Sequence, residues 1–188
     1  MTLAPTLLVS MPQLVDPNFS RAVVLLCKHS AKGAFGLVVN RPLVTSGRVV
    51  VNLGGTTPSG MHETISTDRE LEMWIGGPVE PQRGFLLHST DWGGPESIQV
   101  GDRWTLSATL EILRAIAEGR GPKRWLAALG YAGWGAGQLE EELCGNGWFA
   151  TPGDASLLYD CDVNSRWAAA FKSAGIDPRL LAADYGTA

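Results

Sequence analysis

The sequence is poor in charged residues and in long hydrophobic runs. Charged residues make up 18% of the 188 residues, against about 25% in an average domain. Lys and Arg number 15 and Asp and Glu 19, so the net charge is −4, and no cationic surplus draws the whole molecule to nucleic acid or anionic lipid. The longest uninterrupted apolar run is Ala22–Cys27, far shorter than the roughly 20 residues that cross a bilayer. We expect neither direct nucleic-acid binding nor a membrane span.

Cysteine is also scarce. Cys27, Cys144 and Cys161 are an odd number without C-x-x-C spacing, which argues against a disulfide framework and against a zinc ribbon. The first basic residue is Arg21, so the beginning of the chain lacks the positive segment of a secretory signal. The sequence therefore predicts a cytoplasmic protein, with no metal site and no cofactor.

Glycine and tryptophan, in contrast, are abundant. The chain has 23 Gly and seven Trp, where glycine averages about 7% of residues, and such a chain has many tight turns and close backbone approaches. Hydrophobic residues make up 45%, enough for one sizeable core. We expect a single domain over residues 1–188.

The first part of the chain reads as strands. Leu7–Ser10 is a short apolar entry strand, and Ala22–His29 and Ala34–Asn40 form a hairpin around the loop Ser30–Gly33. The unbroken apolar run of the second strand is typical of a central strand that is covered on both faces. Residues 43–71 carry glycine, proline and charge without periodicity, which favours a mobile surface loop.

Strands continue after this loop and then mix with helices. The later predicted strands are Met73–Ile75, Gly84–His88, Ile98–Val100, Trp104–Leu106, Trp125–Tyr131, Trp148–Ala150 and Leu157–Tyr159. The predicted helices lie between Thr109 and Gly119 with Ser107 as N-cap, over Gln138–Cys144, and over Ser165–Ala174 with Asn164 or Asp162 as cap. Strands first and helices late favour an α/β (mixed α+β) fold, a mixed sheet with helices packed outside.

A glycine-rich stretch, residues 133–137, joins a strand to a helix, an arrangement that can hold a phosphate at the helix N-terminus. The dinucleotide fingerprint needs glycine where Gln138 stands. The acidic run Glu140–Glu142 in the first turns of the helix would repel a phosphate. The favoured interpretation is a tight turn that lets Trp134 pack, with the acidic run as a solvated helix face.

Candidate catalytic residues are Cys27, His29 and His88. Cys27 and His29 are two apart on one predicted strand, so their side chains share a face, and a thiol beside an imidazole serves as nucleophile and base or as metal ligands. His88, at the end of another strand, completes such a site if the strands are neighbours. The alternative is a core cysteine and histidines at strand ends.

Polar and aromatic residues near turns are the candidates for ligand binding. Arg21, Arg41 and Arg83 flank strands or turns, where a guanidinium binds a carboxylate or phosphate or pairs with an acidic side chain of the same protein. The ligand-binding candidates are Asn40, Arg41, Arg83, Tyr131, Trp134 and Gln138. A small basic patch, Arg120 with Lys123 and Arg124, gives weak support for DNA binding without a helix-turn-helix.

Several of these stretches together resemble the YqgE/AlgH family of small bacterial proteins. The segments that carry the resemblance are Ser10-Met11-Pro12, Asp16-Pro17-Asn18-Phe19, Cys27-Lys28-His29, Gly33 to Pro42, Gly76-Gly77-Pro78-Val79, Arg83-Gly84-Phe85, Leu87-His88, Leu129 to Trp134, Gly137 to Glu140, and Trp148. The resemblance runs in order through nearly the whole chain. Before the first helix, Thr109 and Glu111 stand where the family tends to have serine and aspartate.

The resemblance implies a fold more than a function. It implies one α/β domain with a split, strongly bent mixed sheet, partly closed into a small barrel, and helices outside. The family is largely uncharacterised, and some members are named as regulators of alginate production. It therefore implies a non-enzymatic, transcription-related regulator that binds a small molecule or a protein partner. The competing hypothesis is a hydrolase or transferase that uses Cys27, His29 or His88 on an anionic substrate held by Arg41 or Arg83.

Overall fold

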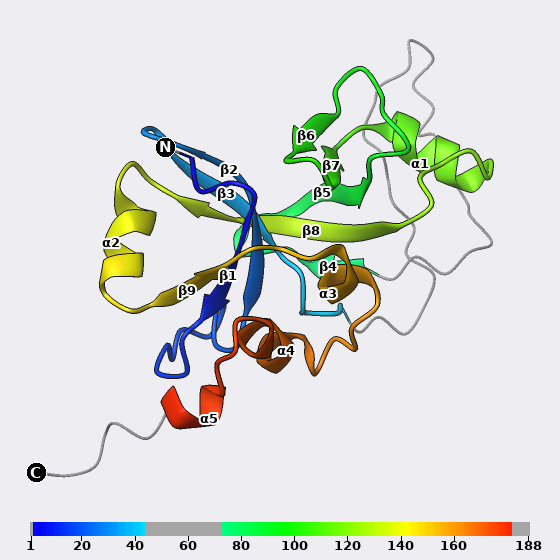
Figure 1. The fold of residues 1–188 in the computed structure, drawn as a ribbon. Helices are drawn as coiled ribbons and strands as arrows, with labels where there is room; N and C mark the ends of the chain where they lie inside the picture. Colours follow the sequence, from blue (N-terminus) through cyan, green and yellow to red (C-terminus); the bar gives the residue numbers. More distant parts are fainter. Residues whose placement is uncertain (1, 44–72, 182–188) are drawn as a thin grey trace, which may run out of the picture.

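The computed structural model describes residues 2–43 and 73–181. Within these ranges the chain forms a nine-stranded sheet with five helices outside it (Figure 1). Apart from Leu43, the loop predicted over residues 43–71 lies outside the described residues.

Most predicted elements are confirmed, with small shifts at their ends. The strands are β1 Thr6–Ser10, β2 Val23–Ser30, β3 Gly33–Val38, β4 Met73–Ile75, β5 Val79–Ser89, β6 Ile98–Val100, β7 Trp104–Ser107, β8 Trp125–Trp134 and β9 Trp148–Thr151. The helices are α1 Leu110–Ala117, α2 Gln138–Cys144, α3 Ala155–Tyr159, α4 Arg166–Ser173 and α5 Pro178–Leu181.

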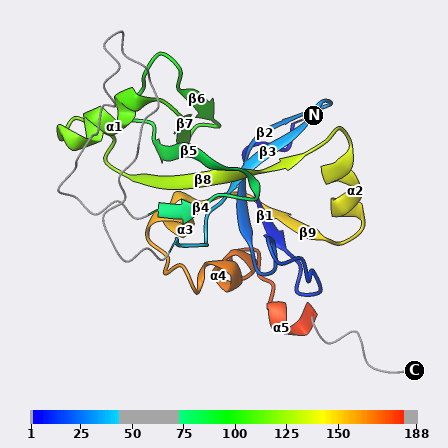
Figure 2. The same ribbon diagram turned by 180° about the vertical axis from the view of Figure 1, so that it is seen from behind.

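The sheet has two halves that share one long strand. The strand order is β6-β7-β5-β8-β3-β2-β1-β9, and β4 pairs with β8 in parallel while the other pairs are antiparallel. The first part of β8 pairs with β5, and its last three residues pair with β3. Figures 1 and 2 show the halves turned steeply against each other about β8. The expected split, strongly bent mixed sheet is confirmed, curled into a half-barrel.

Glycine makes this turn of β8 possible. Gly130 has a φ of 71°, a left-handed conformation that residues with a Cβ rarely adopt. A Cβ at Gly130 would collide with the carbonyl oxygen of Gly77. The chain from β4 to β5 therefore crosses β8 at van der Waals distance, which explains part of the glycine surplus.

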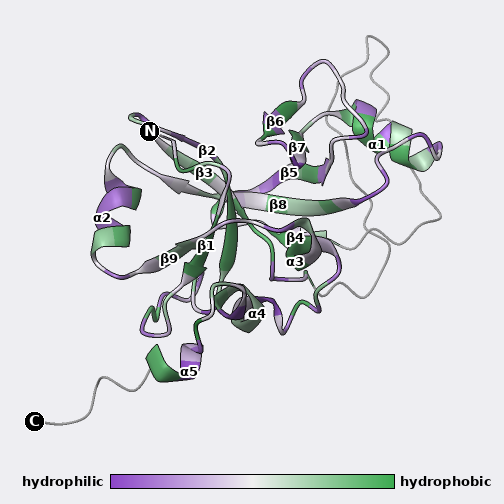
Figure 3. Cartoon of the chain, in the orientation of Figure 1, coloured by the Kyte–Doolittle hydropathy of each residue, from purple (hydrophilic) through white to green (hydrophobic). Residues whose placement is uncertain are grey.

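Strand β2 lies between two hydrophobic cores, as its unbroken apolar run predicts. Val23, Leu25 and Cys27 face a central core shared with α3 and α4. Val24 and Leu26 face a second core, which Leu139 of α2 helps to cover. A third core packs α1 against β4, β5 and β8. The helices thus cover different faces and ends of the sheet, and Figure 3 shows both hydrophilic and hydrophobic residues on α2.

Some local predictions were wrong. Leu157–Tyr159 is part of a helix, not a strand, because the Asp154 side chain accepts a hydrogen bond from the Ser156 N–H at 3.0 Å and caps it. A short apolar run does not distinguish the two. The N-cap of α1 is Thr109, since Ser107 still belongs to β7. Helix α5 was not predicted.

No helix in the described ranges combines the length and the apolar character needed to span a membrane.

Candidate functional site

The structure does not bring Cys27, His29 and His88 together. His88 pairs with Trp125, the first residue of β8, whereas His29 pairs with Ala34, which pairs with Trp134 at the other end of β8. A strand rises about 3.3 Å per residue, so the two histidines are separated by nearly the length of β8. They cannot act on one substrate atom.

Cys27 and His29 also fail to share a face, contrary to the prediction. The register of β2 against β3 shifts between Leu26 and Lys28, and such a bulge interrupts the alternation of side chains. Cys27 consequently packs in the central core, while His29 turns toward Leu3 and α2. Burial raises the pKa of the Cys27 thiol to about 12, so it is protonated and poorly nucleophilic at neutral pH.

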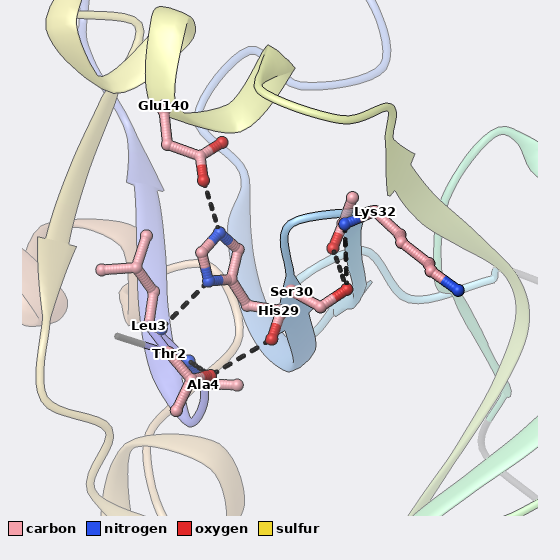
Figure 4. A network of polar contacts seen from close by, with 8 residues as sticks. Thr2, Leu3, Ala4, His29, Ser30, Lys32 and Glu140 are labelled. Carbon is pink, nitrogen blue, oxygen red and sulfur yellow. Dashed lines mark hydrogen bonds and ion pairs between the residues drawn. The ribbon is translucent and has the colours of Figure 1, made fainter.

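His29 connects the N-terminal segment to α2 (Figure 4). Its Nδ1 accepts a hydrogen bond from the Leu3 N–H at 3.2 Å, and its Nε2 lies 2.8 Å from Oε1 of Glu140. Because Nδ1 is an acceptor, we assign the proton to Nε2, which donates to Glu140. The pKa of Glu140 is lowered, first by its own backbone N–H and then by the His29 hydrogen bond. Both nitrogens of this imidazole are occupied by structural contacts.

His88 is fully buried in a chain of hydrogen bonds. Its Nδ1 lies 2.8 Å from the Ser89 carbonyl oxygen and its Nε2 lies 3.0 Å from Oγ of Ser107, which in turn is 2.8 Å from Oγ of Ser97. Burial lowers the pKa of His88. A serine beside an imidazole resembles a nucleophile and its base, but Ser107 is only 1% exposed. The pair has no access for a substrate and stabilises β5 against β7.

Trp134 and Gln138, two ligand-binding candidates, belong to a closed network at α2. One oxygen of Glu142, Oε2, accepts from Nε1 of Trp134 at 2.9 Å and of Trp148 at 2.7 Å, and Oε1 accepts from Nε2 of Gln138 at 2.9 Å. Gln138 Oε1 accepts from the Gly135 N–H. The tight turn that packs Trp134 is confirmed, but Glu142 is not part of a solvated helix face.

Arg83 and Tyr131 lie together on another surface. Arg83 Nη1 donates to Oε2 of Glu80 at 3.1 Å, Tyr131 Oη donates to its Oε1 at 3.3 Å, and the Arg83 guanidinium lies over the Phe85 ring. The Glu80 carboxylate therefore accepts hydrogen bonds from both the Arg83 and the Tyr131 side chains. This cluster fastens the bulged start of β5 to β8.

Asn40 and Arg41 organise the turn before β2. The Asn40 side chain accepts from the Val23 N–H and donates to the Arg21 carbonyl oxygen, both at 2.8 Å. Arg41 donates from Nη1 to the Pro17 carbonyl oxygen and from Nη2 to that of Ser20, both at 2.9 Å. These side chains replace missing backbone partners of the turn, and Asn40 binds the backbone of Arg21.

Beside this turn lies a groove of about 880 Å³, here called the α4 groove. Its walls are Ser20 and Arg21 before β2, Asn40 and Arg41 after β3, and residues between 163 and 179, which lie before, on and after α4. A volume of this size is typical of ligand pockets. The groove thus unites two predicted ligand-binding residues, Asn40 and Arg41, with side chains far along the chain.

Positive charge dominates the α4 groove. Its lining carries four cations, Arg21, Arg41, Lys172 and Arg179, and one carboxylate, Asp177. Arg179 binds that carboxylate with an Nη2–Oδ2 distance of 2.7 Å, and this contact lowers the pKa of Asp177 to about 2. In residues 2–43 and 73–181, neither Arg21 nor Lys172 has a carboxylate partner. Two open cations therefore line one groove of an acidic protein.

Arg21 is held in a strained conformation. Its φ of 52° lies in the left-handed region that residues with a Cβ avoid, and its guanidinium lies 5.5 Å from the centre of the Trp167 ring on α4. Trp167 is fixed in turn because its Nε1 donates to the Ser10 carbonyl oxygen at 2.9 Å. Strain of this kind concentrates at functional sites.

The described residues contain no group of three or more His, Cys, Asp or Glu side chains able to hold a metal ion. The α4 groove offers cationic donors and an aromatic ring.

Comparison with known proteins now identifies the family. The sequence model described as AlgH-like (DUF179) matches residues 7–179. The chain belongs to the AlgH-like family. This confirms the resemblance found in the sequence, and the family is uncharacterised in its activity.

Individual members of the AlgH-like family agree with this. The chain is 49% identical over 186 residues to a UPF0301 protein of Rhizorhabdus wittichii, covering 97% of this chain and 95% of the relative. It is 45% identical over 195 residues to one of Sphingopyxis alaskensis, covering both completely. The solution structure of the AlgH protein from Pseudomonas aeruginosa matches with a TM-score of 0.74 and 36% identity, covering 100% of this chain and 97% of that one. The fold is therefore that of AlgH.

Trp167 and Lys172 complete the α4 groove of this AlgH-like protein, and neither is among the candidate residues predicted from the sequence. Trp167 and Lys172 lie in the helix predicted over Ser165–Ala174, and neither carries a local signal of a binding site. Arg21 was noted beside Arg41. A tryptophan and a lysine on one predicted helix, such as Trp167 and Lys172, are the sequence pattern that could have indicated this side of the α4 groove.

Proposed function

We propose that this protein is a cytosolic, non-enzymatic binding protein with a regulatory, transcription-related role, and that the α4 groove is its ligand site. The observation that carries the proposal is the pair of open cations, Arg21 and Lys172, in one groove of about 880 Å³. Free cationic donors beside an aromatic ring favour an anionic ligand.

The conformation of Arg21 supports this assignment. A left-handed backbone at a residue other than glycine costs about 1–3 kcal/mol and persists where the surrounding structure fixes it. Asn40 fixes the Arg21 carbonyl, and Trp167 lies under its guanidinium. The fold therefore holds one cation in the lining of the groove at a cost in stability, which supports a role in binding.

A regulatory role through a ligand or partner, rather than through DNA, agrees with the charge. Some members of the AlgH-like family are named as regulators of alginate production, but the net charge of this chain is −4. DNA-binding proteins neutralise several phosphates with Lys and Arg, and the groove offers two open cations. We expect no salt-sensitive retention on duplex DNA at low ionic strength. Such retention, lost in Lys172→Glu, would contradict this part of the proposal.

The cytosolic assignment rests on the cysteines. The three cysteines are free thiols in the structure, as is usual in a reducing compartment. Fractionation of cells that produce the protein provides the test, and recovery from a compartment outside the cytosol would overturn the assignment.

The ligand site is tested by anion binding measured with thermal shift and calorimetry. Citrate and pyrophosphate are the probes, and we expect the melting temperature to rise with their concentration and the effect to shrink with salt. Lys172→Glu should abolish the shift. Lys28→Glu changes an exposed lysine on β2, outside the groove, by the same charge and is the matched control. Equal shifts in both variants would show that the anions bind elsewhere.

The enzyme hypothesis has no comparable support. Cys27 is buried with a raised pKa, His29 is engaged by Leu3 and Glu140, and His88 lies at the far end of β8. Arg83 belongs to the Glu80 cluster. These residues do not converge on one substrate position, so binding is the function that the geometry favours.

A further inference from the structure

The chemistry of the α4 groove indicates the kind of molecule that occupies it. We infer that the occupant is an acidic, amphipathic peptide segment of a protein partner, with carboxylates and apolar side chains interspersed. This inference rests on the proposed function, since it names the ligand class of the same groove. It follows from the two open cations, from the apolar parts of the lining and from the size of the site.

The open cations come from separate segments. Arg21 lies in the turn before β2, whereas Lys172 lies near the end of α4. Arg41 has both terminal nitrogens engaged by backbone carbonyls, and Arg179 is paired with Asp177. Phosphate sites gather several donors around one point, with backbone N–H groups among them. The open cations of the α4 groove are instead two single side chains, each of which can pair with one carboxylate of a peptide.

Apolar side chains line the same groove as these cations. Val163, Trp167, Ile176 and Pro178 contribute to the lining, and each of them is partly exposed. An inorganic anion or a small polyacid has no surface that would use these contacts. A peptide with apolar side chains beside its carboxylates would cover them and remove apolar area from water.

The size of the groove agrees with a peptide. At about 880 Å³ it lies near the upper end of the range of roughly 300–1,000 Å³ for ligand pockets. The groove is therefore much larger than one phosphate or carboxylate, and it takes a few residues of an extended chain. Acidic segments are commonly recognised through basic side chains.

Duplex DNA is the other polyanion to consider, and the charge argues against it. The protein has a net charge of −4, and steering of DNA requires a basic face with many phosphate contacts. Two open cations among apolar side chains do not make such a face. Displacement of the peptide by DNA is accordingly one of the outcomes that would overturn the inference.

The test uses three rhodamine-labelled hexapeptides and fluorescence anisotropy on the full chain. One alternates Glu with Leu, the second replaces Glu by Lys, and the third replaces Leu by Ser. We expect binding of the Glu–Leu peptide, at least tenfold weaker binding of the Glu–Ser peptide and none of the Lys–Leu peptide. Raising the salt from 50 to 300 mM should weaken the Glu–Leu complex several-fold.

Groove variants connect this binding to the site. Lys172→Glu and Arg21→Gly should each weaken the Glu–Leu complex at least fivefold, and their combination at least 20-fold. Arg21→Gly suits the left-handed φ of 52°, so it removes the side chain without disturbing the backbone. Lys28→Glu should change the affinity less than twofold.

Several results would overturn the inference. These are no binding of the Glu–Leu peptide, equal binding of the Glu–Ser peptide, binding unchanged by the groove variants, and displacement of the peptide by duplex DNA. If citrate or pyrophosphate still binds with a dependence on Lys172 while the peptide does not, the groove remains an anion site. The peptide inference then fails alone. If binding of neither the anions nor the peptide depends on Lys172, the proposed function fails as well.

Discussion

The α2 end of the molecule and the α4 groove use polar side chains in opposite ways. At α2, each oxygen of Glu142 accepts hydrogen bonds, and two indoles and an amide are its donors. In the groove, Arg21 and Lys172 have no carboxylate partner among the described residues. Saturated polar groups rigidify a structure, whereas open donors beside an aromatic ring leave room for a ligand. Candidate residues are therefore separated by what their polar atoms already bind.

The strongest test of this contrast removes the carboxylate at α2. Glu142→Ala should lower the free energy of unfolding by about 2–4 kcal/mol, because Trp134 and Trp148 each lose a charged acceptor in a partly buried setting and Gln138 loses one at the surface. Urea denaturation measures the loss. Anion binding in the folded variant should stay unchanged.

Glu141→Ala is the matched control for this experiment. Glu141 is exposed on the same helix, and its substitution should change the unfolding free energy by less than about 0.5 kcal/mol. If Glu142→Ala changed the unfolding free energy as little as Glu141→Ala, the network at α2 would not hold β8 to β9. The α2 end would then not differ from the α4 groove in the way described above.

A second test concerns the buried thiol of Cys27. Its pKa is about 12 in the folded chain against 9.0 for a free thiol, so above pH 9 the unfolded state releases a proton that the native state keeps. Stability is therefore fully present below pH 9 and falls as pH rises toward 12, by up to about 1.4 kcal/mol per pH unit. Urea denaturation at pH 8, 9 and 10 under reducing conditions measures this slope.

Two cysteine variants separate this contribution from other titrating groups. Cys27→Ala should have a shallower loss of stability between pH 9 and 10 than the parent chain. Cys144→Ala should keep the parent slope, since Cys144 is exposed and its replacement leaves the buried Cys27 thiol in place. If the Cys27 thiol reacts in the native state at neutral pH, Cys27 is again a candidate nucleophile.

A third test loosens the contact between the N-terminal segment and α2. His29→Ala removes the acceptor of the Leu3 N–H and the donor to Glu140, and it should cost about 1 kcal/mol. Hydrogen exchange should show faster exchange of the Leu3 amide. Lys28→Ala, at the neighbouring exposed position, should leave that amide protected. Retained protection in His29→Ala would mean that other contacts hold the segment.

The sequence predicted the sheet better than the site. The unbroken apolar run of β2 predicted a strand covered on both faces because burial on both faces leaves no alternation. The capped helix α3 was missed, since Leu157–Tyr159 is too short to distinguish helix from strand. Similarly, the bulge at Cys27 has no signature in the apolar pattern, and it is this bulge that separates Cys27 from His29.

The site could be predicted only in part because it joins distant segments. Asn40 and Arg41 were selected from their place at a strand end, and they do line the α4 groove. Their side chains, however, bind the turn before β2. Trp167 and Lys172 meet that turn only through packing of α4 on the sheet, which no local pattern specifies. Whether an arginine binds a ligand or its own backbone depends on the tertiary structure.

The smallest expected change in stability is the most informative for the groove. Arg21→Gly relieves a left-handed conformation that costs about 1 kcal/mol or more for residues with a Cβ and removes a cation–π contact with Trp167 that is worth about 0.5–1 kcal/mol at an exposed site. The two effects nearly cancel, so the unfolding free energy should stay within about 0.5 kcal/mol while anion binding weakens. Asn40 can still bind the carbonyl of residue 21.

Asn40→Ala, which loses both of its 2.8 Å backbone contacts, should be destabilised by about 1–3 kcal/mol. If Arg21→Gly cost as much as Asn40→Ala, the Arg21 side chain would be structural, and the groove would differ from the α2 end in degree only.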